Sequence, residues 1–188
     1  MLLDGLKNTI IITLGALLIG IVLGTAVAVI KFLAEEKPAL KPLAWLCNVY
    51  VTVVRGVPVV VLLLIFYFVI LRSADGIVTG IVAFGINSGA YMAEIIRGGI
   101  NAVDGGQTEA ARSLRFVVLP QAVKNILPAI GNEMIALLKE TAVAGYVAVQ
   151  DLTRAANLIR NNTYDALNPL LATAIVYLTM VVLLTALL

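Results

Sequence analysis

The sequence contains no histidine and a single cysteine, Cys47, among its 188 residues. Without histidine the chain lacks the imidazole metal ligand, the usual proton shuttle and both the Ser-His and the Cys-His catalytic pairs. One cysteine can form neither a disulfide nor a thiolate metal cluster within the chain. We therefore expect no catalytic residue and no metal site, and we expect Cys47 to be a small apolar filler.

Charged residues are also scarce. They make up 13% of the chain, against 61% hydrophobic residues, and the mean hydropathy is +1.04. A soluble domain averages roughly 45–50% apolar and about 25% charged residues. This composition excludes an ordinary soluble enzyme, a disordered chain and a nucleic-acid-binding protein. It favours an integral membrane protein with the lipid bilayer as its surroundings.

Five hydrophobic blocks predict an all-α integral membrane protein with five transmembrane helices, at roughly 20 residues for each crossing. The predicted helices are residues 6–33, 49–71, 77–100, 122–149 and 169–188. The first block is too long for a cleavable signal peptide. No linker or internal repeat divides the chain, so we expect one transmembrane domain over residues 1–188.

The lysines and arginines gather on one side of these helices, in the loop at 34–48 and the region at 97–124. The positive-inside rule makes that side cytoplasmic. Five crossings then place the N-terminus outside and the C-terminus in the cytoplasm.

Small residues recur at four-residue intervals in two of the predicted helices. A stripe of such residues on one helix face allows a second helix to approach closely. We expect helix-packing seams here, although glycine scattered in an apolar span is the alternative. The glycines concerned are Gly20, Gly24, Gly85 and Gly89.

Polar residues mark the third predicted helix. Asn87, Tyr91 and Glu94 are spaced i, i+4 and i+7, so they share one face. A carboxylate inside a bilayer is costly and normally lines a cavity or finds a partner. Two roles are open for Glu94, namely binding a ligand's ammonium group or pairing with Arg97 or Lys139.

The fourth predicted helix is the most polar, with charged residues at Glu133, Lys139 and Glu140. Irregular backbone at membrane depth is tolerated only beside protein or a water-filled cavity. We expect this helix to be central or to break between Lys139 and Gly145. The alternative is that Lys139 and Glu140 lie at the helix end in the interface.

The polar segment 101–119 joins the third and fourth predicted helices. Gly105 and Gly106 end the third helix, and Thr108 can cap a short new one. A solvated loop helix and a partner-binding helix are both compatible with these residues.

Several segments carry a resemblance to a known family. EAARSL at 109–114, followed by LPQA at 119–122, resembles the EAA loop of ABC importer permeases. Nearly the whole chain is similar, in order, to the polar amino-acid uptake branch of that family. The further matching segments are LLDGLKNTI at 2–10, VRGVP at 54–58, NSGAYMAEIIRGGI at 87–100, LLKETAVAGYVAVQDLT at 137–153 and TYDALNPLLATAIVYL at 163–178.

The resemblance implies the transmembrane subunit of an ATP-driven importer in a bacterial or archaeal plasma membrane, of the type I importer fold. Its implied partners are a second permease subunit, two ATPase subunits and an extracytoplasmic amino-acid-binding protein or domain. ATP and Mg would bind the ATPase, so this chain would hold no cofactor; it has no P-loop pattern. A short cytoplasmic coupling helix between helices three and four would dock on the ATPase through Glu109, Ala110, Ala111, Arg112 and Ser113.

By this resemblance the substrate is a polar amino acid, moved by alternating access. Intramembrane carboxylates favour a basic one, unless Lys139 and Arg97 neutralise them. An ion-coupled secondary transporter or channel is the alternative, because buried Glu94 and Lys139 also suit ion coupling. The substrate-pathway candidates are Asn87, Ser88, Tyr91, Glu94, Asp151, Thr153 and Asn157.

The chain departs from the family pattern in three places. Leu114 runs almost directly into the Leu119–Pro120 pair, so either the chain has a true deletion there, which would impair coupling, or a segment is omitted, which we favour. Val57 and Leu62 replace the threonine and glutamine common in relatives. The sequence stops inside its last apolar block, and we expect truncation at both ends.

Overall fold

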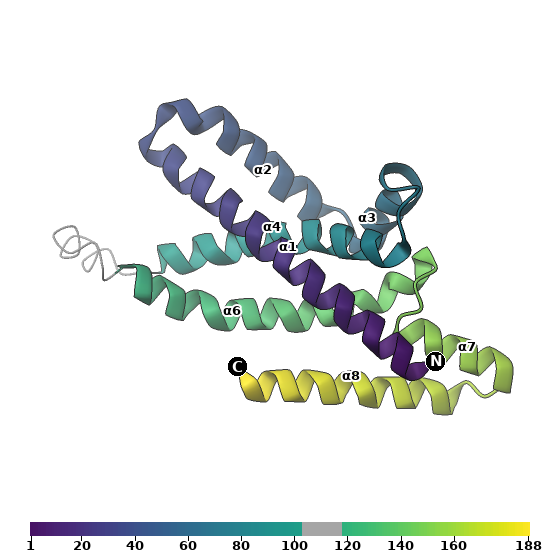
Figure 1. Cartoon of the computed structure of the whole chain (residues 1–188). Coiled ribbons are helices and arrows are strands. Elements are labelled where there is room, and N and C mark those ends of the chain that lie inside the picture. Colours follow the sequence, from purple (N-terminus) through teal and green to yellow (C-terminus); the bar gives the residue numbers. More distant parts are fainter. Residues whose placement is uncertain (103–117) are drawn as a thin grey trace.

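The computed structural model describes residues 1–102 and 118–188, and no strand occurs in those two ranges (Figure 1). Long helices joined by short connections make up the structure. The helices are α1 (Leu2–Glu36), α2 (Lys41–Gly56), α3 (Val59–Ile65), α4 (Gly76–Asn101), α6 (Val118–Glu140), α7 (Leu152–Thr163) and α8 (Leu167–Leu187). The structure also contains 3₁₀ helices at Pro38–Leu40 and Thr141–Val147 and a π-helical turn at Phe66–Ile70.

Among the described residues, three helices, α1, α4 and α8, are each long and apolar enough to cross a membrane. Their bounds contain or closely match the predicted helices 6–33, 77–100 and 169–188. The helix α6 is not among them, and it carries Lys124, Glu133, Lys139 and Glu140. The count of five spans therefore stays a prediction.

The second predicted helix, 49–71, is wrong as a single element. It is replaced by α2, which already begins at Lys41, and by α3 with its π-helical turn; the two parts meet at an angle of 108°. Pro58 causes the break. A proline has no N–H to continue the helix and forces the preceding residue into extended backbone, and Val57 has φ −100° and ψ 132°.

The two predicted glycine stripes face each other where α1 crosses α4 (Figure 1). A Cβ added at Gly24 would lie 2.3 Å from the Cβ of Met92 and 2.9 Å from the backbone nitrogen of Ala93. A Cβ added at Gly85 would lie 2.7 Å from the Cβ of Ile19. Because these separations are far below ordinary contact, the two backbones meet at a distance that only glycine permits.

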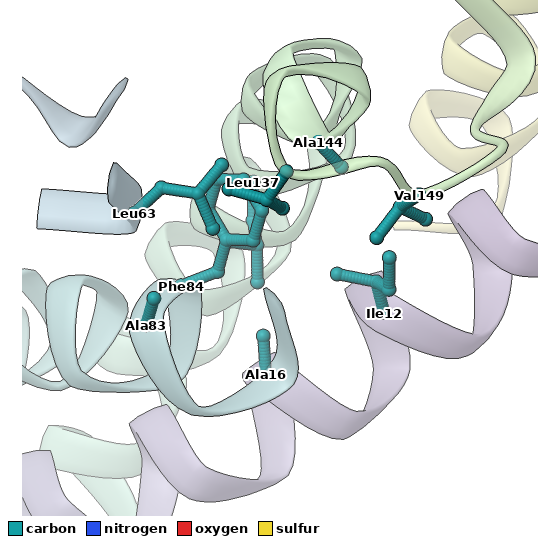
Figure 2. Packing of buried hydrophobic residues seen from close by; sticks show 9 residues of the cluster. Ile12, Ala16, Leu63, Ala83, Phe84, Leu137, Ala144 and Val149 are labelled. Atoms are coloured by element: carbon teal, nitrogen blue, oxygen red, sulfur yellow. The ribbon is translucent and has the colours of Figure 1, made fainter. Parts of the chain in front are cut away.

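A buried apolar cluster joins the helices at one end of this crossing. Figure 2 shows how Phe84 of α4 and Leu63 of α3 meet Leu137 of α6, beside Ile12 of α1. All four side chains are 8% exposed or less. The same cluster contains Ala16, Ala83, Ala144, Val147 and Val149. It fixes α4 against α1 and α6, which positions the polar residues farther along α4.

The polar segment 150–168 forms the amphipathic helix α7, with Asp151 as its N-cap. The buried Asp151 carboxylate accepts hydrogen bonds from the backbone N–H groups of Thr153 and Arg154, at 3.3 and 3.0 Å. The Oγ1 of Thr9 accepts the N–H of Leu152 at 3.2 Å. The side chain of Asn8 donates to the carbonyl of Gln150 at 3.0 Å. These bonds fasten α7 to the first turns of α1.

The substitution Asp151→Ala is expected to lower the free energy of unfolding by about 1–2 kcal/mol, because it removes the cap and leaves two N–H groups unpaired in a buried position. Asp151→Asn keeps an acceptor oxygen, so it should lower the free energy of unfolding by clearly less than Asp151→Ala does. Thermal unfolding of the purified protein in detergent measures both variants. An alanine variant as stable as the asparagine variant would contradict this role for Asp151.

Candidate functional site

The face of α4 that carries Asn87 and Ser88 points toward α6, where it meets two carboxylates. The side chain of Asn87 donates to Oε2 of Glu140 at 3.1 Å, and the hydroxyl of Ser88 donates to Oε1 of Glu133 at 2.9 Å. Asn87 is 3% exposed and Ser88 is fully buried. Both glutamates are half-buried. The contact places two carboxyl groups between α4 and α6.

These two carboxyl groups are held by neutral donors. Within residues 1–102 and 118–188, no Lys or Arg nitrogen lies within 4.0 Å of either Glu133 or Glu140. Lys139 is exposed, so it does not neutralise the pair by contact. Partly buried carboxylates without a cation in contact are costly and often mark a place where a cation binds or passes. The site therefore suits a cationic group of a solute.

Sequence reasoning did not select Glu133 and Glu140 as pathway residues. The available signal was their spacing of seven residues, which puts both on one helix face. The face itself could be recognised only once α6 was seen to pack against α4.

A second polar cluster lies farther along α4. The ammonium of Lys31 forms an ion pair with Oε1 of Glu94 at 2.8 Å. The predicted partners of Glu94, Arg97 and Lys139, are wrong for this contact. The close packing of α1 on α4 brings Lys31 to the Glu94 carboxylate. Lys139 lies in the last turn of α6.

Arg55 and Tyr91 belong to the same cluster. The guanidinium of Arg55, in the last turn of α2, lies 5.0 Å from the centre of the Tyr91 ring. Such a cation–π contact holds the arginine over the aromatic face. A hollow of ≈520 Å³ opens between α1, α2 and α4 at this point, and Arg97 also lines it.

The remaining candidates lie around the start of α7. Thr153 and Asn157 line a separate hollow of ≈460 Å³, together with Tyr146 and Arg154. The guanidinium of Arg154 donates to the carbonyl of Gly145 at 2.7 Å. Burial raises the pKa of Asp151 above its ordinary value. The carboxylate of Asp151 faces the backbone of α7, so it acts as a helix cap in this structure.

The predicted pathway residues thus fall into three groups along the bundle. Asn87 and Ser88 contact the two glutamates of α6. Tyr91 and Glu94 line the hollow between α1, α2 and α4. Asp151, Thr153 and Asn157 lie at the start of α7 and line the second hollow. The predicted coupling residues Glu109, Ala110, Ala111, Arg112 and Ser113 lie outside the described residues.

Comparison with known proteins gives a family match. Residues 20–188 match the profile of the binding-protein-dependent transport system inner membrane component. The arginine transport system permease protein ArtQ of Bacillus subtilis is 37% identical over 196 aligned positions, covering 98% of this chain and 87% of that protein. The putative glutamine transport system permease protein GlnP of Rickettsia conorii is 37% identical over 194 positions, covering 97% and 87%.

A solved structure is also similar. A chain in the crystal structure of an amino acid ABC transporter with histidines superposes with a TM-score of 0.91 at 40% sequence identity. The similarity covers 99% of this chain and 90% of that one. The likeness therefore extends through both the described helices and their arrangement.

Proposed function

The chain belongs to the family of binding-protein-dependent transport system inner membrane components, and we propose that it carries a basic amino acid across the plasma membrane. It is the permease subunit of an amino-acid ABC transporter, like the relatives and the solved transporter it resembles. The observation that carries the choice of a basic substrate is the pair Glu133 and Glu140, which neutral donors hold in the bundle.

The charges of a basic amino acid fit this pair. Such a molecule has two cationic groups, its α-ammonium and its side-chain ammonium or guanidinium, whereas a neutral amino acid has one. A cation brought to a half-buried carboxylate offsets the cost of keeping that charge out of water. Ser88 and Asn87 each donate to one carboxyl oxygen, and within residues 1–102 and 118–188 neither glutamate has an ion pair, so the second oxygen of each can receive the substrate.

Substrate movement requires the bundle to open alternately to the two sides of the membrane. We assign the end of the bundle that holds Lys31, Lys37, Lys41 and Arg97 to the cytoplasm, following the positive-inside rule. The N-terminus then lies outside. A second permease subunit completes the pathway, and an extracytoplasmic binding protein delivers the amino acid.

Coupling to ATP follows from where α4 ends and α6 begins. The two helices run side by side in opposite directions (Figure 1). Gly99, near the end of α4, packs against Ile126 of α6. The chain between them leaves from the end assigned to the cytoplasm. Glu109 to Ser113 in that chain would dock on an ATPase subunit, which binds ATP and Mg and performs the hydrolysis. The Ser88–Glu133 hydrogen bond joins α4 to α6. A movement of one of these helices relative to the other therefore changes the substrate site.

The substitution Glu109→Lys is expected to reduce co-purification of the partner ATPase by about tenfold or more, since a reversed charge in a docking contact costs several kcal/mol. Glu36→Lys is the matched control, because Glu36 is exposed at the end of α1 on the same side. The measurement is a pull-down from membranes of cells expressing both subunits. Equal recovery of the ATPase with both variants would contradict docking through this segment.

A further inference from the structure

The hollow between α1, α2 and α4 has an excess of positive charge. Three cationic side chains, Lys31, Arg55 and Arg97, line it together with one carboxylate, Glu94. Lys31 is committed to Glu94 at 2.8 Å. In the part of the chain that the structure describes, no carboxylate oxygen lies within 4.0 Å of Arg55 or Arg97. Both arginines are exposed to the hollow or its mouth.

The hollow continues the polar face of α4. Tyr91 and Glu94 lie one and two turns beyond Asn87 on the same face, in the direction of the α4 end at Asn101. The Asn87–Glu140 hydrogen bond marks the start of this face. A solute that leaves the glutamates toward the end assigned to the cytoplasm therefore passes the two arginines.

The contacts around Arg55 and Arg97 leave their N–H donors available to bind an anion. The Tyr91 ring holds the Arg55 guanidinium 5.0 Å from its centre, so the side chain is partly ordered before anything binds. Lys31 pairs with Oε1 of Glu94, and among the described residues no nitrogen of Arg55 or Arg97 lies within 4.0 Å of this carboxylate, so Glu94 does not use the arginines' donors. A guanidinium offers paired donors that match the two oxygens of a carboxylate. The volume of ≈520 Å³ lies in the range of small-molecule sites.

We propose that Arg55 and Arg97 bind the α-carboxylate of the amino acid on its way to the cytoplasm. This inference rests on the proposed function, because it assumes that an amino acid passes along α4. The glutamates then recognise the cationic groups of the substrate, and the two arginines recognise its anionic group. The separation of opposite charges along one helix face orients the molecule during passage.

The test compares L-arginine with agmatine, which is arginine without its carboxylate. Both compete for labelled L-arginine on the complete complex of permease and ATPase in lipid nanodiscs. The unchanged protein should prefer L-arginine by about ten- to hundredfold, the strength of a charge-assisted contact. Arg97→Gln and Arg55→Gln should each reduce that preference to less than about threefold. Each variant should weaken the binding of L-arginine and leave the binding of agmatine unchanged. Arg97→Lys, which keeps the charge, should retain part of it.

The matched control is Arg72→Gln, because Arg72 is exposed in the turn before α4 at the other end of the bundle. It should leave the preference unchanged. An undiminished preference in both the Arg55 and Arg97 glutamine variants overturns the inference while leaving the proposed function intact. Loss of the preference in the unchanged protein when anionic lipid is added to the nanodisc would also overturn it, by assigning the arginines to a lipid phosphate. Failure of the unchanged protein to bind either compound contradicts the basic substrate itself.

Discussion

Replacing Glu133 with glutamine is expected to lower the uptake of labelled L-arginine by about a hundredfold. The change removes one charge and keeps the shape of the side chain, including an oxygen that accepts the Ser88 hydroxyl. Removing one partner of a desolvated charge pair typically costs about 2–5 kcal/mol, and a hundredfold change is about 2.7 kcal/mol. The measurement is the initial uptake rate in proteoliposomes that contain the permease, its ATPase and the binding protein.

Lys139→Gln is the control for this substitution. Lys139 belongs to the same helix as Glu133 and is exposed. The uptake rate of the Lys139→Gln variant should therefore equal that of the unchanged protein. The variant Glu140→Gln should behave like Glu133→Gln, because Asn87 holds Glu140 in the equivalent way. Uptake within about threefold of the unchanged rate in both glutamate variants would contradict their role in recognising a cation.

The substitution Gly24→Ala is expected to have the largest effect on stability. The new Cβ would lie 2.3 Å from the Cβ of Met92 and 2.9 Å from the backbone nitrogen of Ala93. A clash with backbone cannot be relieved by a rotamer change, so α1 and α4 must separate. Overpacking typically costs about 1–3 kcal/mol, and a clash with backbone places this substitution at the upper end of that range. The measurement is the melting temperature of the purified protein, together with the fraction that elutes as a folded species in size-exclusion chromatography.

Gly98→Ala provides the matched control for the same chemical change. Gly98 belongs to α4, the partner of α1 in this crossing, and a Cβ there meets nothing within 4 Å. Alanine in an open helical position should be neutral or should stabilise the protein by up to about 1 kcal/mol. Similar melting temperatures for Gly24→Ala and Gly98→Ala would contradict the close α1–α4 packing.

Features that depend on local sequence were largely predictable. The uncharged run after Lys7 predicted α1, and the last apolar block predicted α8, each within a few residues of its bounds. The break at the end of α6, at Glu140, was one of two expectations for the polar fourth helix. These outcomes follow from hydropathy and polarity along the chain, which need no knowledge of neighbouring helices.

Features that depend on how helices pack were harder to predict. Pro58 was visible in the sequence, yet the 108° angle between α2 and α3 could be read only from the structure. The partner of Glu94 is Lys31, which lies 63 positions earlier and reaches Glu94 only because α1 crosses α4. The glutamates of α6 became candidates for the same reason, since their importance lies in the contact with α4.

The measurement that tests the central claim most directly is uptake of labelled L-arginine into proteoliposomes that contain the complete transporter. The account predicts uptake that requires ATP on the cytoplasmic side and the binding protein on the other. It also predicts competition by L-lysine and weak competition by neutral amino acids. Uptake that an ion gradient drives in the absence of ATP would contradict the account and favour a secondary transporter.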